Sequence, residues 1–467
     1  MVTVAVVGGG IAGLAAALQL RDRLGPAARI TVYEQRRWPG GKLRTGSLAG
    51  IPAEQGADAF LVREPGGTGE SAAVALARRV GLAGELVHPP SLPAGLLLAG
   101  TLHPMPGGTL LGVPGDLDRI AGVARPAPGR DRPGPAPLLA PGADVAVGEL
   151  VRRRLGDLVA DRLVEPMLGG VYAGRVDELS LAATMPGLAA ACRTEPTLVG
   201  AVRAALAAAP RPAGEPVFGA VRGGMGALVD AVSGASGAEL RLGAPVRELV
   251  PAGPGWQLAV GSTRNPQRVP ADAVVLALPA RPAARLLAKV NPAVAGLVGQ
   301  LDYASVALVT LALPPGAVAL PEWTGFLVPA AEPTLVKAAT FLTRKWPQLA
   351  GPGDPVLVRA SVGRFRDERA LHRPDADLAA QVHAELGRIL AGRALPEPVG
   401  VQVQRWGGAL PQYAPGHLDR VAAARAGLPD TLRLAGAGYD GVGIPACVRS
   451  GRTAADALAA TLEQSPS

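Results

Sequence analysis

The segment Val4-Ala-Val-Val-Gly-Gly-Gly-Ile-Ala-Gly13 decides the fold of this chain. Its first four residues form an apolar, valine-rich run that is typical of a buried parallel strand. The glycines match the pattern G-x-G-x-x-G, and apolar residues then recur at helical spacing up to the stop signal Gly25-Pro26. A second apolar run, Arg29 to Tyr33, ends in Glu34. Strand, glycine loop, helix, strand and acid in this order predict a dinucleotide-binding unit.

The spacing within this segment has a physical reason. Glu34 follows Gly13 by 21 residues, close to the ~20 expected of the acid that accepts hydrogen bonds from a ribose. Glycines let the backbone approach a pyrophosphate, and the helix N-terminus offers free N–H groups and a positive dipole end. A signal peptide is the alternative interpretation of this apolar start. It is disfavoured because no basic residue precedes the run and the glycines interrupt it.

Composition limits the classes of partner. The 467 residues are 48% hydrophobic and carry a net charge of +8, which indicates a globular chain of two or three domains. Arginine supplies most of the positive charge, which favours an anionic small molecule or contact with an anionic membrane surface. Nucleic acid is not expected, because only 3% of the residues are aromatic and no compact basic run contains them.

Cysteine and histidine give no sign of a metal site. Cys192 and Cys447 are far apart and form no C-x-x-C pair, and the five histidines show no ligand spacing. No disulfide is expected either. Prolines interrupt the longest apolar stretches, so we expect no transmembrane helix and a cytoplasmic location, with peripheral membrane contact as an option.

Two further glycine-rich segments indicate which dinucleotide binds. Residues 35–44 read Gln-Arg-Arg-Trp-Pro-Gly-Gly-Lys-Leu-Arg, with two glycines that allow a tight turn beside a cofactor. Near the C-terminus, a short strand from Leu432 precedes a second glycine loop and a helix that starts near Pro445. The positive end of that helix would stabilise the negative charge of a reduced flavin. Together these segments predict FAD rather than NAD.

The rest of the chain predicts a mixed sheet and a helical region. Strands are expected over residues 240–250, 256–260, 272–279, 303–313, 335–342, 356–363 and 399–405, of which 272–279 should return to the dinucleotide-binding sheet. Helices are expected over residues 71–80, 147–167, 180–210 and 377–391. The Pro-rich stretch 124–142 is expected to form a loop or a disordered excursion.

Several longer segments are more specific than a cofactor motif. The first glycine motif is common to a whole superfamily, but Gly169-Gly-Val-Tyr-Ala-Gly174 and Leu410-Pro-Gln-Tyr413 are more particular. With them, most of the chain resembles the bacterial protoporphyrinogen and coproporphyrinogen oxidases, flavoproteins of the amine-oxidase superfamily. Segment 124–142 departs from the family pattern. The other matching segments are 39–44, 55–58, 163–168, 178–181, 303–306, 325–329, 337–347, 359–364, 405–406, 416–417 and 441–445.

The resemblance implies an α/β and α+β protein with a discontinuous Rossmann-like FAD-binding domain, a mixed-sheet substrate domain and an inserted helical domain. The helical domain contacts membranes in some members of the family. The expected boundaries are 1–65, 213–290 and 405–467 for the FAD-binding domain, 66–90 and 291–404 for the substrate domain, and 91–212 for the helical domain.

The resemblance also implies a reaction. FAD would take hydride from a porphyrinogen in a six-electron oxidation, and O2 would re-oxidise the flavin to give H2O2. The motifs are similar to those of the soluble branch that acts on coproporphyrinogen III in haem biosynthesis. Protoporphyrinogen IX is the alternative substrate, and an enzyme of the haem pathway is a candidate partner.

The expected site residues follow from these motifs. The flavin N5 carries the chemistry, so we assign no catalytic acid or base and no metal ligand. Arginines suit the propionates of such a substrate, and the candidates are Arg63, Arg175, Arg359, Arg364 and Arg366. The expected substrate contacts are Gly170, Val171, Tyr172, Arg63 and Arg364. The expected cofactor contacts are Gly8, Gly10, Ile11, Ala12, Gly13, Glu34, Gln35, Gly41, Lys42, Gly56, Ala57, Asp58, Val246, Trp406, Gly436, Val442, Gly443 and Ile444.

Three other functions share the cofactor motifs. An amine oxidase would place a pair of aromatic rings beside the flavin, and only Trp406, Tyr413 and Tyr439 are available. A carotenoid desaturase acts on an apolar substrate, which leaves the arginines unexplained. Prenyl-protein escort factors have the same fold and bind no flavin, but their nucleotide motif is degraded, whereas the one here is intact.

Overall fold

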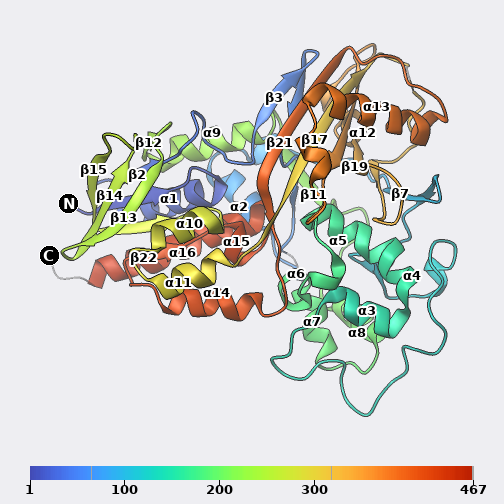
Figure 1. Cartoon of the computed structure of the whole chain (residues 1–467), viewed down its shortest axis with the longest axis horizontal. Helices are drawn as coiled ribbons and strands as arrows, with labels where there is room; N and C mark the ends of the chain where they lie inside the picture. Colours follow the sequence, from blue (N-terminus) through green and yellow to red (C-terminus); the bar gives the residue numbers. More distant parts are fainter. Residues whose placement is uncertain (65, 317, 465–467) are drawn as a thin grey trace.

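The computed structural model describes residues 1–64, 66–316 and 318–464. Figure 1 shows three parts: a layered unit that contains both ends of the chain, a long twisted sheet, and a group of helices beside that sheet. The α/β and α+β fold class expected from the sequence is confirmed. The domain boundaries given above stay a prediction.

A five-stranded parallel sheet forms the centre of the layered unit. Its strands come from three distant parts of the chain, so the sheet forms only when these parts meet. The predicted return of residues 272–279 is confirmed, because Val4 pairs with Ala273. The strand order is β12 (Glu239–Arg241), β2 (Arg29–Tyr33), β1 (Thr3–Val7), β16 (Ala273–Leu276) and β22 (Leu432–Leu434).

Different layers cover the two faces of this sheet, as a parallel sheet requires. On one face, α1 (Ile11–Leu24) and α16 (Ile444–Gln464) pack together through small side chains such as Ala16 and Ala455. On the other face, an antiparallel sheet buries Trp256, and three helices extend the layer. These elements are β13 (Val246–Ala252), β14 (Gly255–Val260), β15 (Gln267–Ala271), α10 (Ala280–Leu287), α11 (Pro292–Gly299) and α14 (His417–Ala426).

The long twisted sheet has seven strands, and only its β18–β7 pair is parallel among the described residues. α13 (Asp375–Ala391) covers one face with Leu378, Val382 and Leu386. The four strands predicted between residues 303 and 405 are neighbours within this sheet. The strand order is β21 (Gly400–Pro411), β17 (Tyr303–Leu313), β20 (Val356–Val362), β19 (Val336–Phe341), β18 (Gly325–Leu327), β7 (Gly95–Leu98) and β8 (Thr101–Pro104).

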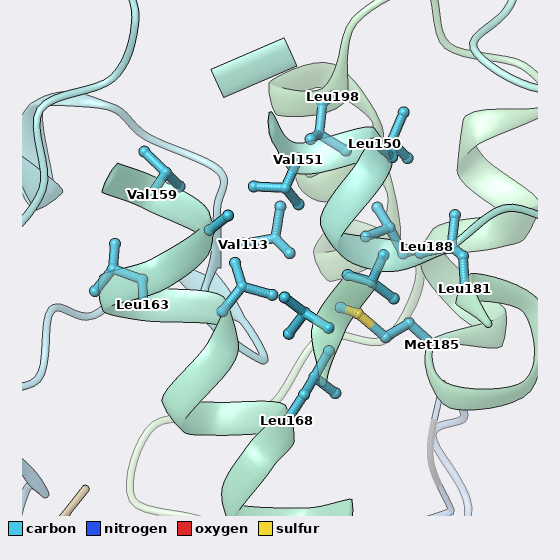
Figure 2. Close-up of a cluster of buried hydrophobic side chains, with 14 of the residues drawn as sticks. Val113, Leu150, Val151, Val159, Leu163, Leu168, Leu181, Met185, Leu188 and Leu198 are labelled. Atoms are coloured by element: carbon cyan, nitrogen blue, oxygen red, sulfur yellow. The ribbon is translucent and has the colours of Figure 1, made fainter. Parts of the chain in front are cut away.

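The helical group has its own apolar core. Figure 2 shows Leu150, Val151, Leu163, Leu168 and Met185 among the side chains that converge there. The helices are α3 (Val147–Leu155), α4 (Asp157–Val159), a π-helical turn (Ala160–Val164), α5 (Glu165–Tyr172), α6 (Leu181–Thr184), α7 (Pro186–Cys192) and α8 (Leu198–Ala208).

Shorter elements connect these parts. The glycine-rich segment after residue 44 forms a two-stranded hairpin. The connecting elements are β3 (Thr45–Leu48), β4 (Ile51–Glu54), β5 (Phe60–Leu61), α2 (Ala72–Arg79), β6 (Leu86–Val87), β9 (Thr109–Leu110), β10 (Val113–Pro114), β11 (Phe218–Val221), α9 (Met225–Ser236), α12 (Leu342–Lys345) and α15 (Ala437–Asp440).

Three predicted elements are divided in the structure. The strand expected over residues 240–250 is wrong, because the chain turns at Gly243 (φ +64°) and its two halves join different sheets. The helix expected over 147–167 breaks at Gly156 (φ +92°) and passes through the π-helical turn. The helical stretch 180–210 consists of three helices, of which the second starts at Pro186. Glycine and proline account for these interruptions, since each changes the backbone locally.

The Pro-rich stretch 124–142 contains no helix or strand, which agrees with the expected loop. The loop packs on the helical group through Ala124 and Leu139. The Asp131 carboxylate accepts hydrogen bonds from the amides of Leu198 and Val199, at 2.8 and 2.9 Å. The loop therefore caps the first turn of α8.

A buried ion-pair group joins the layered unit to the long sheet. The Asp58 carboxylate contacts Lys345 Nζ at 2.7 Å, Arg359 Nη2 at 2.8 Å and Trp346 Nε1 at 3.2 Å. Arg359 also donates to the carbonyl oxygens of Glu54 and Gly56. The two cations hold the pKa of Asp58 well below its usual value against the opposing effect of burial.

We expect Asp58→Asn to destabilise the protein by about 3–5 kcal/mol, because it leaves two buried cations without their anion. Denaturant unfolding of the purified protein measures this change. Asp302→Asn is the matched control, since it removes a surface pair with Arg281 and should cost less than about 1 kcal/mol. Equal losses in the two variants would contradict a structural role for the Asp58 group.

Candidate functional site

The first glycine loop contacts the segment that follows Glu34, the residue expected to bind the ribose. Gly10 is the N-cap residue of α1, so the first amides of that helix have no partner within the helix. The Gly40 amide donates to the Gly9 carbonyl oxygen at 2.7 Å. A Cβ placed on Gly41 would lie 3.2 Å from Gly10 Cα. Two of the predicted cofactor segments therefore lie in direct contact.

The glycines of the site fall into two groups. A Cβ on Gly8, Gly13 or Gly56 would overlap a carbonyl oxygen of the protein itself, so these glycines serve the fold. A Cβ on Gly10 would meet no atom within 4 Å, although this residue is only partly exposed at the start of α1. Gly443 is equally open, with its nearest neighbour at 3.9 Å. The open space at the α1 N-terminus fits a pyrophosphate group.

Glu34 lies beside this space. The side chain is 7% exposed, and its Oε2 accepts from the Gly9 amide at 2.9 Å while Oε1 accepts from the Arg36 amide at 2.8 Å. Each oxygen keeps a lone pair that a ribose hydroxyl can use. Gln35 is exposed next to it. Val246 lies near the same strand end, because the Ala244 amide donates to the Glu34 carbonyl oxygen at 2.8 Å.

Residues 42–58 continue the chain segment that lies beside the first glycine loop. The Lys42 carbonyl oxygen accepts from the Ala57 amide at 3.2 Å, and Trp406 Nε1 donates to the Gln55 carbonyl oxygen at 2.7 Å. Burial lowers the pKa of the Lys42 ammonium, yet part of its surface stays accessible, as expected of a residue that lines an internal space. The ion pairs described above occupy the Asp58 carboxylate, so its predicted cofactor contact would come from its main chain.

The second glycine loop is held by a polar network at the start of α16. The Gly436 amide donates to Ser450 Oγ at 2.8 Å, and Ser450 donates to Asp440. Arg425 binds the Asp440 carboxylate through both terminal nitrogens. Gly451 packs against the main chain of Ala12, which fixes α16 on α1. The loop that leads to Ile444 is therefore positioned by the same helix that follows the first loop.

The Cys447 thiol lies close to this loop. Burial raises its pKa to about 11, so the thiol stays protonated near neutral pH.

The predicted substrate wall is α5 and the segment that follows it. Gln412 Nε2 donates to the Tyr172 carbonyl oxygen at 2.8 Å, and the rings of Tyr172 and Tyr413 lie 5.6 Å apart in an edge-to-face arrangement. Val171 is 43% exposed on the other side of the helix. Val442 of the second glycine loop packs against the cluster that contains Tyr172 and Tyr413. The wall is thus joined to the predicted flavin loop.

The candidate arginines separate into distinct groups. Arg359 binds Asp58, Arg63 binds Glu215 at 2.9 Å, and Arg366 binds Glu178 at 3.0 Å. These three guanidinium groups are therefore paired with carboxylates of the protein itself. Arg364 lies behind the α5 wall, since a Cβ on Gly169 would be 3.5 Å from Arg364 Nη1. Arg175 lies 3.6 Å from Glu165.

Sequence reasoning did not single out two buried charges near Arg364. Glu165 is 5% exposed and Lys337 is 4% exposed, and neither was assigned a role. The available signal was Lys337 itself, a lone lysine within an apolar strand of a chain with only four lysines. Gln412, whose side chain joins motif 169–174 to motif 410–413, was also given no role.

We expect Gly10→Val to fold and to lose the flavin. The backbone at Gly10 is extended (φ −74°, ψ 173°) and the space in front of it is open, so the protein tolerates the side chain while the pyrophosphate does not. Visible flavin absorption per mole of purified protein and the thermal unfolding midpoint measure the two effects. Gly13→Ala should instead lower the midpoint, because its Cβ would overlap the Gly8 carbonyl oxygen.

Gly234→Ala is the control, since a Cβ there meets open space within α9. It should keep the flavin, and its midpoint should stay the same or rise slightly, because alanine favours a helix more than glycine does. A Gly10→Val protein that retains a full complement of flavin would disprove the assignment of the loop.

Comparisons with known proteins agree with this geometry. The sequence profile described as "Flavin containing amine oxidoreductase" matches residues 11–459. The coproporphyrinogen III oxidase of Mycobacterium tuberculosis is 40% identical over 447 residues, covering 95% of this chain and 94% of that protein. The enzyme of the same name from Bacillus subtilis is 31% identical, with 97% of each chain covered.

A solved structure supports the same relationship. A crystal structure from an Exiguobacterium species, provisionally assigned as a protoporphyrinogen oxidase, superimposes with a TM-score of 0.84 at 32% identity and covers 99% of each chain. The chain therefore belongs to the flavin-containing amine oxidoreductase family, and it is an FAD-dependent oxidoreductase.

Proposed function

We propose that this chain oxidises coproporphyrinogen III to coproporphyrin III in haem biosynthesis. The observation that carries the proposal is the contact between the two motifs most particular to porphyrinogen oxidases. They lie 240 residues apart in sequence and meet through the bond from Gln412 to Tyr172. Their common wall packs against Val442 of the predicted flavin loop. Relatives named coproporphyrinogen III oxidase, which match this chain over nearly their whole length, support the choice of substrate.

The proposed reaction is a six-electron oxidation in three equal rounds. In each round the porphyrinogen loses a hydride and a proton, and bound FAD supplies the two-electron acceptor. One O2 per round is reduced to H2O2, so three molecules of O2 are consumed for each porphyrin formed. The residues of this chain bind the substrate, orient it beside the flavin and exclude water, and such positioning lowers the barrier of the reaction.

The expected cofactor residues keep their roles in this proposal. The first loop (Gly8, Gly10, Ile11, Ala12, Gly13) holds the pyrophosphate, and Glu34 holds the ribose. Gly41, Lys42, Gly56 and Ala57 line the path towards the flavin. Trp406, Gly436, Val442, Gly443 and Ile444 surround its ring. Gly170, Val171 and Tyr172 form the substrate wall, and Arg364 lies directly behind it.

The structure disfavours an amine-oxidase site. Tyr413 Oη donates to the Ala437 carbonyl oxygen, and Trp406 Nε1 donates to Gln55. Tyr413 is 1% exposed, Tyr439 is 2% exposed and Trp406 is 5% exposed. Tyr413 and Tyr439 are committed to the protein interior, so neither gives Trp406, the ring placed beside the flavin, an open aromatic partner for an amine.

Protoporphyrinogen IX is the second candidate substrate. It shares the macrocycle and two of the propionates, so the same wall fits it. In addition, the net charge of +8 supports peripheral contact with an anionic membrane and docking of another enzyme of the haem pathway. Within the described residues, no helix combines the length and the apolar character that a membrane span needs.

Aerobic incubation of the flavin-loaded protein with each porphyrinogen tests the proposal. Porphyrin fluorescence should rise faster with coproporphyrinogen III, and three H2O2 should form per porphyrin. The Gly10→Val protein is the control for auto-oxidation. A rate for both substrates no higher than in this control would reject the function, and a faster rise with protoporphyrinogen IX would assign the other substrate.

A further inference from the structure

A cluster of buried charges lies behind the α5 wall. It consists of Glu165 on α5, Lys337 on β19, Arg364 after β20 and Arg175 after α5, and we call it the Glu165 cluster. The Glu165 and Lys337 side chains are more than nine-tenths buried. A Cβ on Gly169 would lie 3.3 Å from Glu165 Oε2 and 3.5 Å from Arg364 Nη1, so these two groups meet at one turn of α5.

The cluster is not satisfied by the protein alone. Both carboxylate oxygens of Glu165 are buried without a hydrogen-bond partner among residues 1–64, 66–316 and 318–464, and the Arg175 guanidinium stays 3.6 Å away. In the part of the chain that the structure describes, the Lys337 ammonium has no hydrogen-bond partner either. Arg364 donates from Nη2 to the Val328 carbonyl oxygen at 2.7 Å, and among the described residues its other guanidinium nitrogens make no such bond. Buried ionic groups without hydrogen bonds are costly, so a ligand that completes them is favoured.

The charges of the Glu165 cluster indicate that the missing ligand is an anion. Three cations surround one carboxylate, so with all four ionised the cluster carries two positive charges in excess. Asp367 is the other acid that acts on Arg364, and it lies in the exposed turn after it. Burial lowers the pKa of Lys337 to about 7, as expected for an ammonium without its own anion. An anion with several acceptor oxygens fits these donors best.

The position of the cluster connects it to the proposed substrate wall. Glu165 and Tyr172 are seven residues apart in sequence, which places them on the same face of α5 at about 10 Å. The Phe365 amide, next to Arg364, donates to the Ala173 carbonyl oxygen at 2.7 Å. Phe365 also belongs to the apolar cluster of Trp406. Arg364 is therefore adjacent in sequence to a residue that packs in the same cluster as a predicted flavin contact.

We propose that Lys337, Arg364 and Arg175 form a subsite for a carboxylate group of the substrate. Glu165 limits the affinity of this subsite for the carboxylate. This inference rests on the proposed function and adds to it. Arg175 has a side chain that is 36% exposed, so it can meet the carboxylate first, while Lys337 lies deeper. The Glu165 carboxylate repels the ligand and keeps the empty cluster from carrying three uncompensated charges.

Binding of the oxidised porphyrin separates this proposal from the catalytic one. The flavin-loaded protein is titrated with coproporphyrin III and with its tetramethyl ester, and fluorescence gives the dissociation constants. We expect Lys337→Met to weaken binding of the acid about tenfold, as hydrogen bonds between charged groups require, with little change for the ester. Glu165→Gln should bind the acid as tightly as the unchanged protein or more tightly. Lys289→Met, at an exposed pair with Glu248, is the matched control.

Several outcomes would overturn the subsite. One is an equal loss for acid and ester in Lys337→Met, and another is a loss in Glu165→Gln as large as that in Lys337→Met. The latter result would show a purely structural pair. A shifted pH profile of kcat with an unchanged KM for coproporphyrinogen III would assign Lys337 to proton transfer instead.

Flavin content and the unfolding midpoint show whether each variant folds. If Lys337→Met does not fold, the more exposed Arg175→Met takes its place in the same titration, with the same expected selectivity for the acid. If the unchanged protein binds coproporphyrin III but oxidises no porphyrinogen, the proposed function fails while the subsite is still tested. If it binds neither acid nor ester, both proposals fail.

Discussion

Close contact between backbones is the constraint on which this structure depends. Gly13 packs against Gly8, Gly56 against Lys42, and Gly451 against Ala12, each at a distance that leaves no room for a side chain. These contacts bring the first loop, the segment after the ribose acid and the C-terminal helix into one place. The parallel sheet has the same dependence, since its five strands also come from distant parts of the chain. The cofactor site is therefore a product of the whole fold, although its motifs are local in sequence.

The same residue type serves two purposes, and geometry separates them. Glycines that touch the protein backbone allow the segments to assemble, whereas Gly10 and Gly443 face open space. A motif shows glycine in both cases, so the pattern alone does not reveal which positions face a ligand. The structure makes the distinction, because a cofactor needs empty volume beside free N–H groups. Gly10 and Gly443 support FAD binding, because the packing of the protein itself does not require glycine at these two positions.

Much of the fold could be predicted from the sequence because its signals are local. The valine-rich strand, the glycine loop and the first helix have the expected bounds, and the strands between residues 303 and 405 share one sheet. The interruptions at Gly156 and Gly243 were missed, since a glycine inside an apolar pattern is often tolerated. The sequence could not show which of the candidate arginines are paired within the protein and which are available to a ligand. Arg359 and Arg364 look alike in sequence, yet one is bound to Asp58 and the other lies beside an unsatisfied carboxylate. Their roles depend on tertiary neighbours that no spacing reveals.

The two buried charge groups obey one physical rule with opposite results. Around Asp58, two cations and an indole donate to a single carboxylate, and the group is complete without a ligand. Around Glu165, the carboxylate oxygens and the Lys337 ammonium lack such bonds within the described part of the chain, although the Glu165 and Lys337 side chains are less exposed than that of Asp58. A complete group stabilises the joint between two parts of the fold, and it needs nothing more. An incomplete group destabilises the folded protein. Proteins retain such groups at sites where a bound ligand completes the missing hydrogen bonds. The position of the Glu165 cluster behind the α5 wall, close to the predicted flavin loop, makes an anionic substrate the most direct way to complete it.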